Sequence, residues 1–473
     1  MRRSNLIRWS CTVLLLMMMS LSQGYTQEDI LTKSYKDKVI QTVAQYLTDY
    51  YVFPELAQRT AEHLTQLNKE NYFEQYTDLP QFAEALSSRI YAISKDKHIS
   101  VNVRKQDPAA EAEIDEMEQW MASRMEERRY FRRYNANFKS VSKLDGNIGY
   151  LDLRGFYGLD FGLRFADYAM AMLATSDAII IDLRNNSGGR GDMVGYLLSY
   201  FFDEPVIGSK TRKRSGDQFT ERINMTSAFV NGKKMPDVPL FVLTSKTTFS
   251  AAEGFSYPLK VYKRATFIGE TTKGGANPGD IIPLNDELEI FIPDVSVTHP
   301  VTNASWEGVG ISPDVSMPSE QALDSAKVRA TEAAAAYRQK LDEKAKASLL
   351  ALSETVENYD GSDAQIVIDA YLACRENDLI FEEWEVNALG YQLLAEKAEA
   401  TALAIFKTNT VLYPFSPNTF DSYAEALMGK GRNEEAIENY QQAVRLAEER
   451  NDPDLALFKE NLENALKPKD HQE

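Results

Sequence analysis

Four short runs of apolar residues constrain the fold of this chain more than any other feature. They span residues 148–153, 178–183, 240–244 and 265–269, and helical patterns separate most of them. Continuous apolar strands are expected where helices cover both faces of a sheet. The sequence therefore predicts an α/β core over residues 146–317. A hairpin-like pair of strands is expected at its far end, near residues 288–292 and 295–297.

The first 24 residues have the composition of an export signal. Arg2, Arg3 and Arg8 precede an apolar run over residues 13–21, and small residues follow it. The run is too short to span a membrane. Cys11 precedes it, whereas a lipoprotein needs its cysteine just after the apolar stretch. We therefore expect residues 1–24 to be removed and the mature chain to be exported, to a periplasm or outside the cell, with no integral membrane segment.

Charge and cysteine content exclude several classes of protein. Without the signal the chain keeps only Cys374, so it can form no internal disulfide. The formal net charge is −18 for the full chain, and it becomes about −21 once the signal is removed. Nucleic-acid binding requires a basic stripe, and the sequence has none, so we expect no nucleic-acid partner. Nothing in the sequence indicates a metal ion or another cofactor.

Helical periodicity dominates both flanks of the α/β core. Residues 25–105 are predicted to form an amino-terminal helical subdomain of three short helices, and residues 106–145 a charged connector with a solvated helix. Residues 318–360 are rich in Ala, Lys and Glu and are predicted to form a helical linker.

Residues 361–470 contain an internal repeat. Positions recur at a spacing of 34, in the pairs Leu389 and Tyr423, Leu393 and Leu427, Ala402 and Ala436, Phe406 and Tyr440, and Leu412 and Leu446. This period is typical of tetratricopeptide repeats, so an all-α tetratricopeptide-like domain is predicted here. Stacked helix pairs form a concave surface, which makes the region a candidate site for a protein partner.

Ser250 stands where one of the apolar strands has ended and the next helix begins. A serine there can expose its Oγ beside free backbone amides, as nucleophiles do in α/β enzymes. The simpler alternative is a helix cap, because Ser250 and Glu253 also have the spacing of a capping box. The strand over residues 178–183 runs into Gly188 and Gly189, which either aim N–H groups at an oxyanion or form an ordinary tight turn. These segments alone leave both alternatives open.

A serine nucleophile needs a base, and the chain has four histidines. His471 lies in the tail, His63 falls on a helical pattern, and His299 precedes a proline in a β segment. His98 enters a short alternating strand after a turn and is the best-placed candidate. Its alternative role is purely structural.

Seven motifs occur in an order that resembles a known protease family. They are Tyr-Val-Phe-Pro-Glu at 51–55, Asp-Lys-His at 96–98, Gly-Asn-Ile-Gly-Tyr at 146–150, Asp-Leu-Arg-Asn-Asn-Ser-Gly-Gly at 182–189, Thr-Phe-Ser-Ala-Ala-Glu at 248–253, Gly-Glu-Thr-Thr at 269–272 and Glu-Gly-Val-Gly-Ile-Ser-Pro-Asp at 307–314. Over residues 35–317 the chain resembles the tail-specific, or carboxy-terminal processing, serine proteases, in the branch near the tricorn protease core and the interphotoreceptor retinoid-binding protein. The resemblance implies a ClpP/crotonase-like α/β core.

The same resemblance implies roles for individual residues. Ser250 matches the family nucleophile. The backbone N–H groups of Ala251 and of Gly188 or Gly189 match its oxyanion hole.

The base differs between branches of the family. Processing proteases use a lysine at a position that falls on Gly275 here, and Lys273, two residues earlier, is the alternative base. The tricorn-like branch uses a histidine and a glutamate, which match His98 and Glu307, although the serine preceding that histidine is Lys97 in this chain. We also find no PDZ insertion between residues 250 and 269 or within 106–145.

These expectations converge on a serine-type peptidase that hydrolyses peptide bonds in a protein or peptide substrate through a Ser-His-Glu relay. The alternative is a non-catalytic binding protein for apolar ligands or peptides on the same scaffold, as in the retinoid-binding relatives. A ligand-binding module would not need Ser250, His98 and Glu307 together, so their joint presence favours the enzyme.

Overall fold

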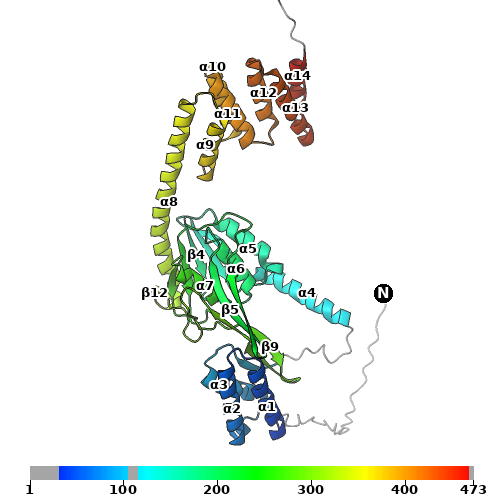
Figure 1. Cartoon of the computed structure of the whole chain (residues 1–473), viewed down its shortest axis with the longest axis vertical. Coiled ribbons are helices and arrows are strands. Elements are labelled where there is room, and N and C mark those ends of the chain that lie inside the picture. Colours follow the sequence, from blue (N-terminus) through cyan, green and yellow to red (C-terminus); the bar gives the residue numbers. More distant parts are fainter. Residues whose placement is uncertain (1–30, 105–115, 468–473) are drawn as a thin grey trace, which may run out of the picture.

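The computed structural model describes residues 31–104 and 116–467, and the molecule is elongated (Figure 1). Helices α1–α3 lie at one end, a mixed α/β core lies in the middle, and helices α9–α14 lie at the other end. The predicted signal at 1–24 lies outside the described residues. Within the part of the chain that is described, no helix is long and apolar enough to cross a membrane.

The amino-terminal helices are α1 (Lys33–Tyr50), α2 (Pro54–Lys69) and α3 (Leu79–Ser94), with the short 3-10 helix η1 (Tyr72–Gln75) before α3. Their starts follow from the sequence. The side chains of Thr32 and Asp78 cap α1 and α3, and Pro54 is the first residue of α2, where its missing N–H costs nothing. The three short helices expected here are therefore confirmed.

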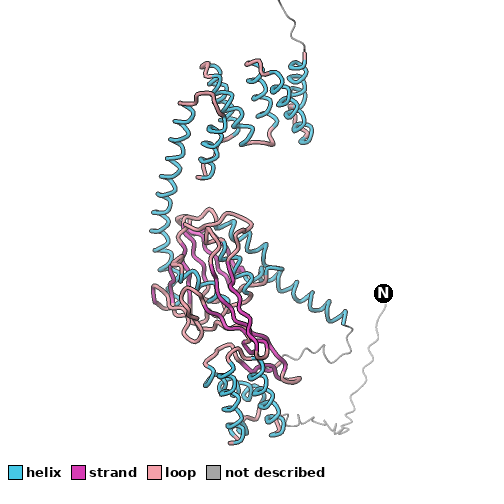
Figure 2. The backbone as a smooth tube through the Cα atoms, in the orientation of Figure 1, coloured by secondary structure: helices cyan, strands magenta, loops and turns pink. Residues whose placement is uncertain are grey.

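A small sheet completes the apolar core of these helices. Strand β1 (Ser100–Val103) pairs with β10 (Leu288–Pro293), which pairs with β9 (Gly279–Pro283), all antiparallel. The buried side chains of Leu288, Ile290 and Ile292 belong to the same cluster as α1–α3. Figure 2 shows these strands extending from the core to the helices. Residues about 190 positions apart in sequence thus form one core, and β1 begins two residues after His98.

The predicted hairpin of residues 288–292 with 295–297 is wrong. Strand β11 (Val295–Thr298) pairs with β5 (Ile207–Ser215), not with β10. One residue, Asp294, separates β10 from β11, and a hairpin loop needs at least two. Strand β5 also pairs with β6 (Gln218–Met225), in a long hairpin that the sequence analysis did not anticipate.

The central sheet has six strands in the order β12-β8-β7-β4-β3-β2. They are β2 (Phe138–Leu144), β3 (Ile148–Leu153), β4 (Ala178–Asp182), β7 (Leu240–Thr244), β8 (Thr266–Gly269) and β12 (Val315–Ser316). All neighbours are parallel except β2 and β3. This confirms the predicted α/β core and its four apolar strands.

Helices cover both faces of this sheet, as the apolar strands predict. Ile179 and Ile181 of β4 pack in one cluster with α5 (Leu159–Leu173), α6 (Gly191–Ser199) and α7 (Ala251–Val261). Ile180, on the other face of β4, packs against α8 (Ser319–Glu357). Helix α4 (Glu116–Tyr134) and the short η2 (Asn135–Asn137) precede β2, and α4 projects away from the sheet (Figure 1).

The carboxy-terminal helices are α9 (Ala364–Glu376), α10 (Glu383–Ala395), α11 (Glu399–Leu412), α12 (Pro417–Gly429), α13 (Asn433–Arg450) and α14 (Leu455–Leu466). Helices α10 and α12 begin 34 positions apart, as do α11 and α13. Two of the residue pairs that recur at this spacing are buried in one cluster: Ala402 with Ala436, and Phe406 with Tyr440. The region is all-helical as expected, and its identification as tetratricopeptide repeats stays a prediction.

Candidate active site

Ser250 lies between β7 and α7, at the carboxyl edge of the central sheet, and its backbone is strained. Its φ and ψ are 54° and −119°, a region that L-residues other than glycine rarely adopt. Its own N–H donates to Glu253 Oε2 at 2.9 Å, so the Glu253 half of the predicted capping box is present. Ser250 therefore occupies a sharp strand-to-helix turn of the kind that exposes nucleophiles, and it also begins the helix.

The glycine turn after β4 packs directly against this serine. A Cβ atom on Gly188 would lie 2.8 Å from the Cβ of Ser250, so only glycine allows this approach. The Gly188 N–H donates to Asn186 Oδ1 at 2.9 Å. Among the hydrogen bonds of the described residues, the N–H groups of Gly189 and Ala251 donate none. Of the three expected oxyanion donors, Gly189 and Ala251 are thus the two that are free.

His98 is buried beside the same turn. Its ring lies 4.4 Å from the ring of Phe249, the residue before Ser250, and 5.9 Å from Phe291. The side chain is 8% exposed, and neither ring nitrogen has a hydrogen-bond partner in the described chain. Burial, and then the positive charge of Lys273, lower the pKa of His98 to about 4. The ring is therefore neutral at neutral pH and can accept a proton.

Glu307 approaches from the loop before β12. Its Oε2 accepts the N–H groups of Ala276 at 2.5 Å and Asn277 at 3.3 Å, while its buried Oε1 has no partner in the structure described. Burial, and then the nearby carboxylate of Asp96, raise the pKa of Glu307 to about 7. Glu307 can thus change protonation state in the physiological range.

Asp96 is a site residue that the sequence analysis missed, although its motif contained it. One of its oxygens lies 3.8 Å from His98 Nδ1 and accepts the His98 N–H at 2.9 Å. The other accepts from Tyr51 Oη and Asn277 Nδ2, both at 3.2 Å. Asp96 therefore fixes the backbone of His98 and ties it to the loop that holds Glu307.

Asp96, His98 and Glu307 also have the donor set of a metal site. Each offers one ligand atom, and these atoms lie within 4.8 Å of one another. Two carboxylates and an imidazole suit a divalent transition metal. Asp96 and one Glu307 oxygen already accept protein hydrogen bonds, which leaves Glu307 Oε1 and the His98 ring nitrogens as the unengaged atoms. The absence of a metal from the site stays a prediction.

Neither position considered for a lysine base, Gly275 or Lys273, has the surroundings that such a base would need. A Cβ atom on Gly275 would lie 2.7 Å from His98 Cε1 and 2.1 Å from Phe249 Cε2, so the space for a side chain at 275 is already filled by these two rings. Lys273 is exposed, and its ammonium lies 4.4 Å from the centroid of the Phe249 ring. The geometry thus brings His98 against the serine turn, with the Lys273 charge nearby.

A cleft of about 650 Å³ opens beside Ser250. Ser250, Ala251 and Gly189 line it together with apolar side chains that include Val194 and Trp306. Strands β5 and β6, the hairpin missed in the sequence, form another wall. A chain seated in this cleft would contact Ser250, Gly189 and Ala251. The fold and these groups are those expected of an α/β protein of the serine-hydrolase class.

Comparison with known families agrees with this class. Residues 147–317 match the family described as peptidase family S41, and residues 26–139 match the N-terminal domain of peptidase S41 in eukaryotic IRBP. The two ranges together span more than half of the 473 residues. The chain belongs to peptidase family S41.

Individual relatives match only part of the chain. A probable CtpA-like serine protease of Staphylococcus epidermidis is 27% identical over 203 residues, which is 41% of this chain and 39% of that protein. A protein of the same description from Staphylococcus aureus is 26% identical over 204 residues, covering 41% of this chain and 38% of the relative. The chain thus spans about two fifths of the length of the curated relatives it matches.

Two solved structures illustrate the structural similarity. The photosystem II D1 C-terminal processing protease is 15% identical with a TM-score of 0.37, and the match covers 60% of this chain and 93% of that one. The tricorn protease is 12% identical with a TM-score of 0.41, and the match covers 64% of this chain and 37% of that one.

Proposed function

We propose that this chain is a serine peptidase that hydrolyses peptide bonds in protein or peptide substrates, with Ser250 as the nucleophile. The observation that carries the proposal is the strained turn at Ser250, flanked by the unpaired N–H groups of Gly189 and Ala251. Strain of this kind persists where a function requires it, and backbone N–H donors without a protein partner suit a developing oxyanion.

His98 is the proposed base. Because its pKa is lowered to about 4, its ring is neutral and can take the proton of the Ser250 hydroxyl. Ser250 Oγ then forms a bond to the carbonyl carbon of the substrate, and the oxyanion accepts from Gly189 and Ala251. The imidazolium returns its proton to the leaving amine, and the C–N bond breaks. A water molecule, deprotonated by His98, then releases the acyl group.

Glu307 is the proposed orienting carboxylate. Its unpaired Oε1 can accept an N–H of His98, which would fix the tautomer and stabilise the imidazolium. A second carboxyl group, that of Asp96, lies 3.8 Å from His98 Nδ1. Lys273 stays the alternative base. Its exposed position and the filled space at Gly275 favour His98.

Activity-based labelling tests the proposal. A fluorophosphonate probe should label the wild type and not Ser250→Ala, and His98→Ala should lower labelling and peptide hydrolysis together. Ser256→Ala is the matched control, because that serine is buried five residues into α7 and bonds only to Ala252 O. Labelling that survives Ser250→Ala would refute the nucleophile. Activity that survives His98→Ala and is lost in Lys273→Ala would reassign the base.

We propose further that the chain is exported after removal of residues 1–24 and that the helices over 361–470 dock a protein partner. The signal composition supports export, and the 34-residue spacing of helix starts supports a repeat module. Mass spectrometry of the mature amino terminus tests the first proposal. Detection of an intact Arg2–Arg3 terminus in the functional protein would contradict it.

A further inference from the structure

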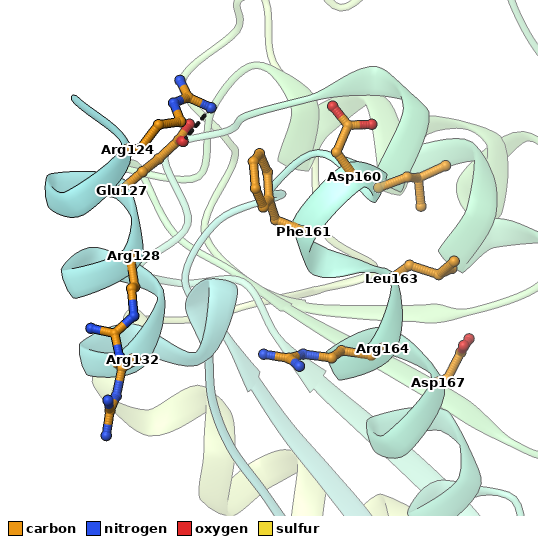
Figure 3. A pocket seen from close by; sticks show the side chains of 10 residues that line it. Arg124, Glu127, Arg128, Arg132, Asp160, Phe161, Leu163, Arg164 and Asp167 are labelled. Carbon is orange, nitrogen blue, oxygen red and sulfur yellow. Dashed lines mark ion pairs between the residues drawn. The ribbon is translucent and has the colours of Figure 1, made fainter. Parts of the chain in front are cut away.

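A second cleft, of about 810 Å³, lies between α4 and α5, and four arginines are among the residues that line it (Figure 3). Arg124, Arg128 and Arg132 come from α4, and Arg164 comes from α5. A spacing of four residues places the three α4 arginines on one face of that helix. Figure 3 shows Arg164 extending from α5 toward α4. Arginines from two elements thus line one space.

Most of these arginines lack a carboxylate partner in the described chain, although the guanidinium of Arg164 lies 5.0 Å from the centroid of the Phe165 ring. Arg124 pairs with Glu127 at 2.7 Å. Over the described residues, Arg128, Arg132 and Arg164 form no ion pair, although the chain as a whole has 70 acidic and 52 basic residues. This protein is rich in carboxylates, yet these clustered arginines pair with none of them. They are therefore available to bind the anionic group of another molecule.

The acidic groups of the cleft do not cancel this charge. Asp167 accepts from Tyr196 at 2.5 Å, Tyr200 at 3.1 Å and Asn231 at 3.1 Å, so its oxygens face the core side of α5. Asp160 also lines the cleft, and in the view of Figure 3 the ring of Phe161 stands between its carboxylate and α4. The side of the cleft that faces α4 is therefore positively charged.

The two clefts of the core adjoin each other. Leu159, the first residue of α5, lines both the arginine cleft and the cleft that contains Ser250. A polypeptide bound at Ser250 can therefore continue past Leu159 into the space between α4 and α5. A small anion or a flat lipid surface would not use this continuity.

We propose that the cleft between α4 and α5 binds an acidic segment of the polypeptide substrate, at a distance from the bond that is cleaved. This inference rests on the proposed peptidase function. It names the substrate class of the same site: polypeptides with a run of Asp or Glu adjoining the segment seated at Ser250. Binding through surface arginines weakens with ionic strength, because mobile ions screen exposed charges.

The experiment measures binding to the Ser250→Ala protein, so that no turnover is required. The probes are three fluorescent peptides: an uncharged sequence, and the same sequence with four glutamates at its amino or its carboxyl end. We expect one acidic peptide to bind about tenfold more tightly than the uncharged one at low salt, and to lose this advantage at high salt. Adding Arg128→Glu and Arg132→Glu together should abolish the advantage.

Arg129→Glu with Arg133→Glu is the matched control. These residues lie on the same helix and change the net charge equally, but they do not line the cleft. The control pair should keep the preference. Equal binding of all three peptides, or an equal loss in both pairs of variants, would overturn the inference.

Two further measurements distinguish this inference from the proposed peptidase activity and from binding to a membrane. Hydrolysis of the uncharged peptide by the wild type reports on Ser250 alone. If no peptide is cleaved while the arginine-dependent preference remains, the peptidase proposal fails and the acidic-segment site stands.

Exposed Met117 and Trp120 on α4 make a membrane the rival occupant. Arginine-dependent binding to vesicles of anionic phospholipid, with no preference among the peptides, would overturn the inference in favour of that rival.

Discussion

His98 and Glu307 are neighbours whose pKa values shift in opposite directions. Burial and Lys273 lower the pKa of His98 to about 4, and burial and Asp96 raise that of Glu307 to about 7. Each shift favours the neutral form of its group, as expected where water is excluded. Near pH 7 the imidazole is therefore neutral while the carboxyl group is partly ionised. In the proposed relay, Glu307 is therefore the group that changes its protonation state near pH 7.

The pH dependence of activity should report this pair. Because a protonated Glu307 cannot stabilise the imidazolium, kcat/KM should rise with pH through an apparent value near 7 that belongs to both groups. In Glu307→Gln the rising limb should move toward pH 4, where only His98 titrates, and the rate should fall on the order of 100-fold. Peptide hydrolysis from pH 4 to 9 measures both effects.

Glu270→Gln is the control for that profile. Glu270 pairs with Lys246 at 3.1 Å and lies outside the site, so its variant should keep the wild-type limb. An unchanged limb in Glu307→Gln would show that Glu307 does not govern the base.

Gly275 offers a test of the packing around the proposed base. Gly275→Ala puts a methyl group where His98 Cε1 and Phe249 Cε2 already lie, 2.7 and 2.1 Å from the new atom. One or both rings must move, so we expect a loss of roughly 1 to 3 kcal/mol in stability and a fall of about tenfold or more in kcat/KM, because misplaced catalytic groups are costly. Thermal unfolding and peptide hydrolysis measure the two losses.

Gly429→Ala is the control, because a Cβ atom there meets nothing within 4 Å. It should leave activity unchanged. If Gly275→Ala kept wild-type activity, His98 would not need its present position.

Motif residues were easier to predict than their surroundings. The candidates Ser250, His98 and Glu307 come from motif order, and their catalytic roles stay predictions. Asp96 was passed over, because a carboxylate two residues before a histidine has no periodic signal of its own. Its contacts with Tyr51 and Asn277 join segments 45 and 181 positions away, which only the folded chain brings together. The sequence also could not show that the Gly188 N–H donates a hydrogen bond to Asn186 Oδ1.

At the scale of elements, one buried carboxylate joins helix α7 to the loop that carries Gly275. Glu253 is fully buried and accepts from Ser250 N–H at 2.9 Å, Thr272 Oγ1 at 2.5 Å, Gly274 N–H at 2.7 Å and Gly275 N–H at 2.9 Å. The capping residue expected from the sequence therefore has a larger role than capping. It fixes the serine turn against the loop that packs on His98.

Glu253→Gln should break this junction. An amide has one acceptor oxygen and brings two N–H donors, so at least one backbone N–H loses its acceptor in a dry interior. We expect a loss of about 3 kcal/mol in unfolding free energy and a matching drop in fluorophosphonate labelling. Glu354→Gln, exposed on α8, is the control and should change neither. Full labelling in Glu253→Gln would mean that the turn holds without this carboxylate.

Elements with a strong pattern were predicted, and those defined by distant pairing were not. The central strands and helices α1–α3 follow from apolar runs, caps and Pro54. The hairpin of β5 and β6 was missed, because its strands are mostly polar and half-exposed and lack the apolar alternation of a core strand. The hairpin of β10 and β11 was predicted wrongly because each strand joins a different sheet. Strand β10 pairs with β1, about 190 positions away, and β11 pairs with β5, about 80 positions away.

At the scale of the whole molecule, helix α8 holds together two separate apolar cores. Its first half buries Ala322, Ala326, Ala330 and Ala334 against the central sheet. Its far end buries Leu352 with α9–α11. Between Ala334 and Leu352 no residue of the helix is buried. An exposed ion pair between Lys233 and Asp378 also joins the core to the carboxy-terminal helices, and it contributes little to stability.

Two cores joined by a solvated helix should unfold independently. We therefore expect two transitions in calorimetry, because neither apolar cluster needs the other to form. Lys344→Pro, in the unburied stretch of α8, should leave both transitions near their wild-type temperatures, since a proline costs about 3 kcal/mol only in the helix turn that it breaks. It should also leave Ser250 labelling intact, because α8 contacts the sheet before that point. Scattering measurements should show a shorter or more variable molecule, while Lys344→Ala matches the wild type. A single transition in the wild type, or loss of labelling in Lys344→Pro, would instead mean that the carboxy-terminal helices support the folded core directly.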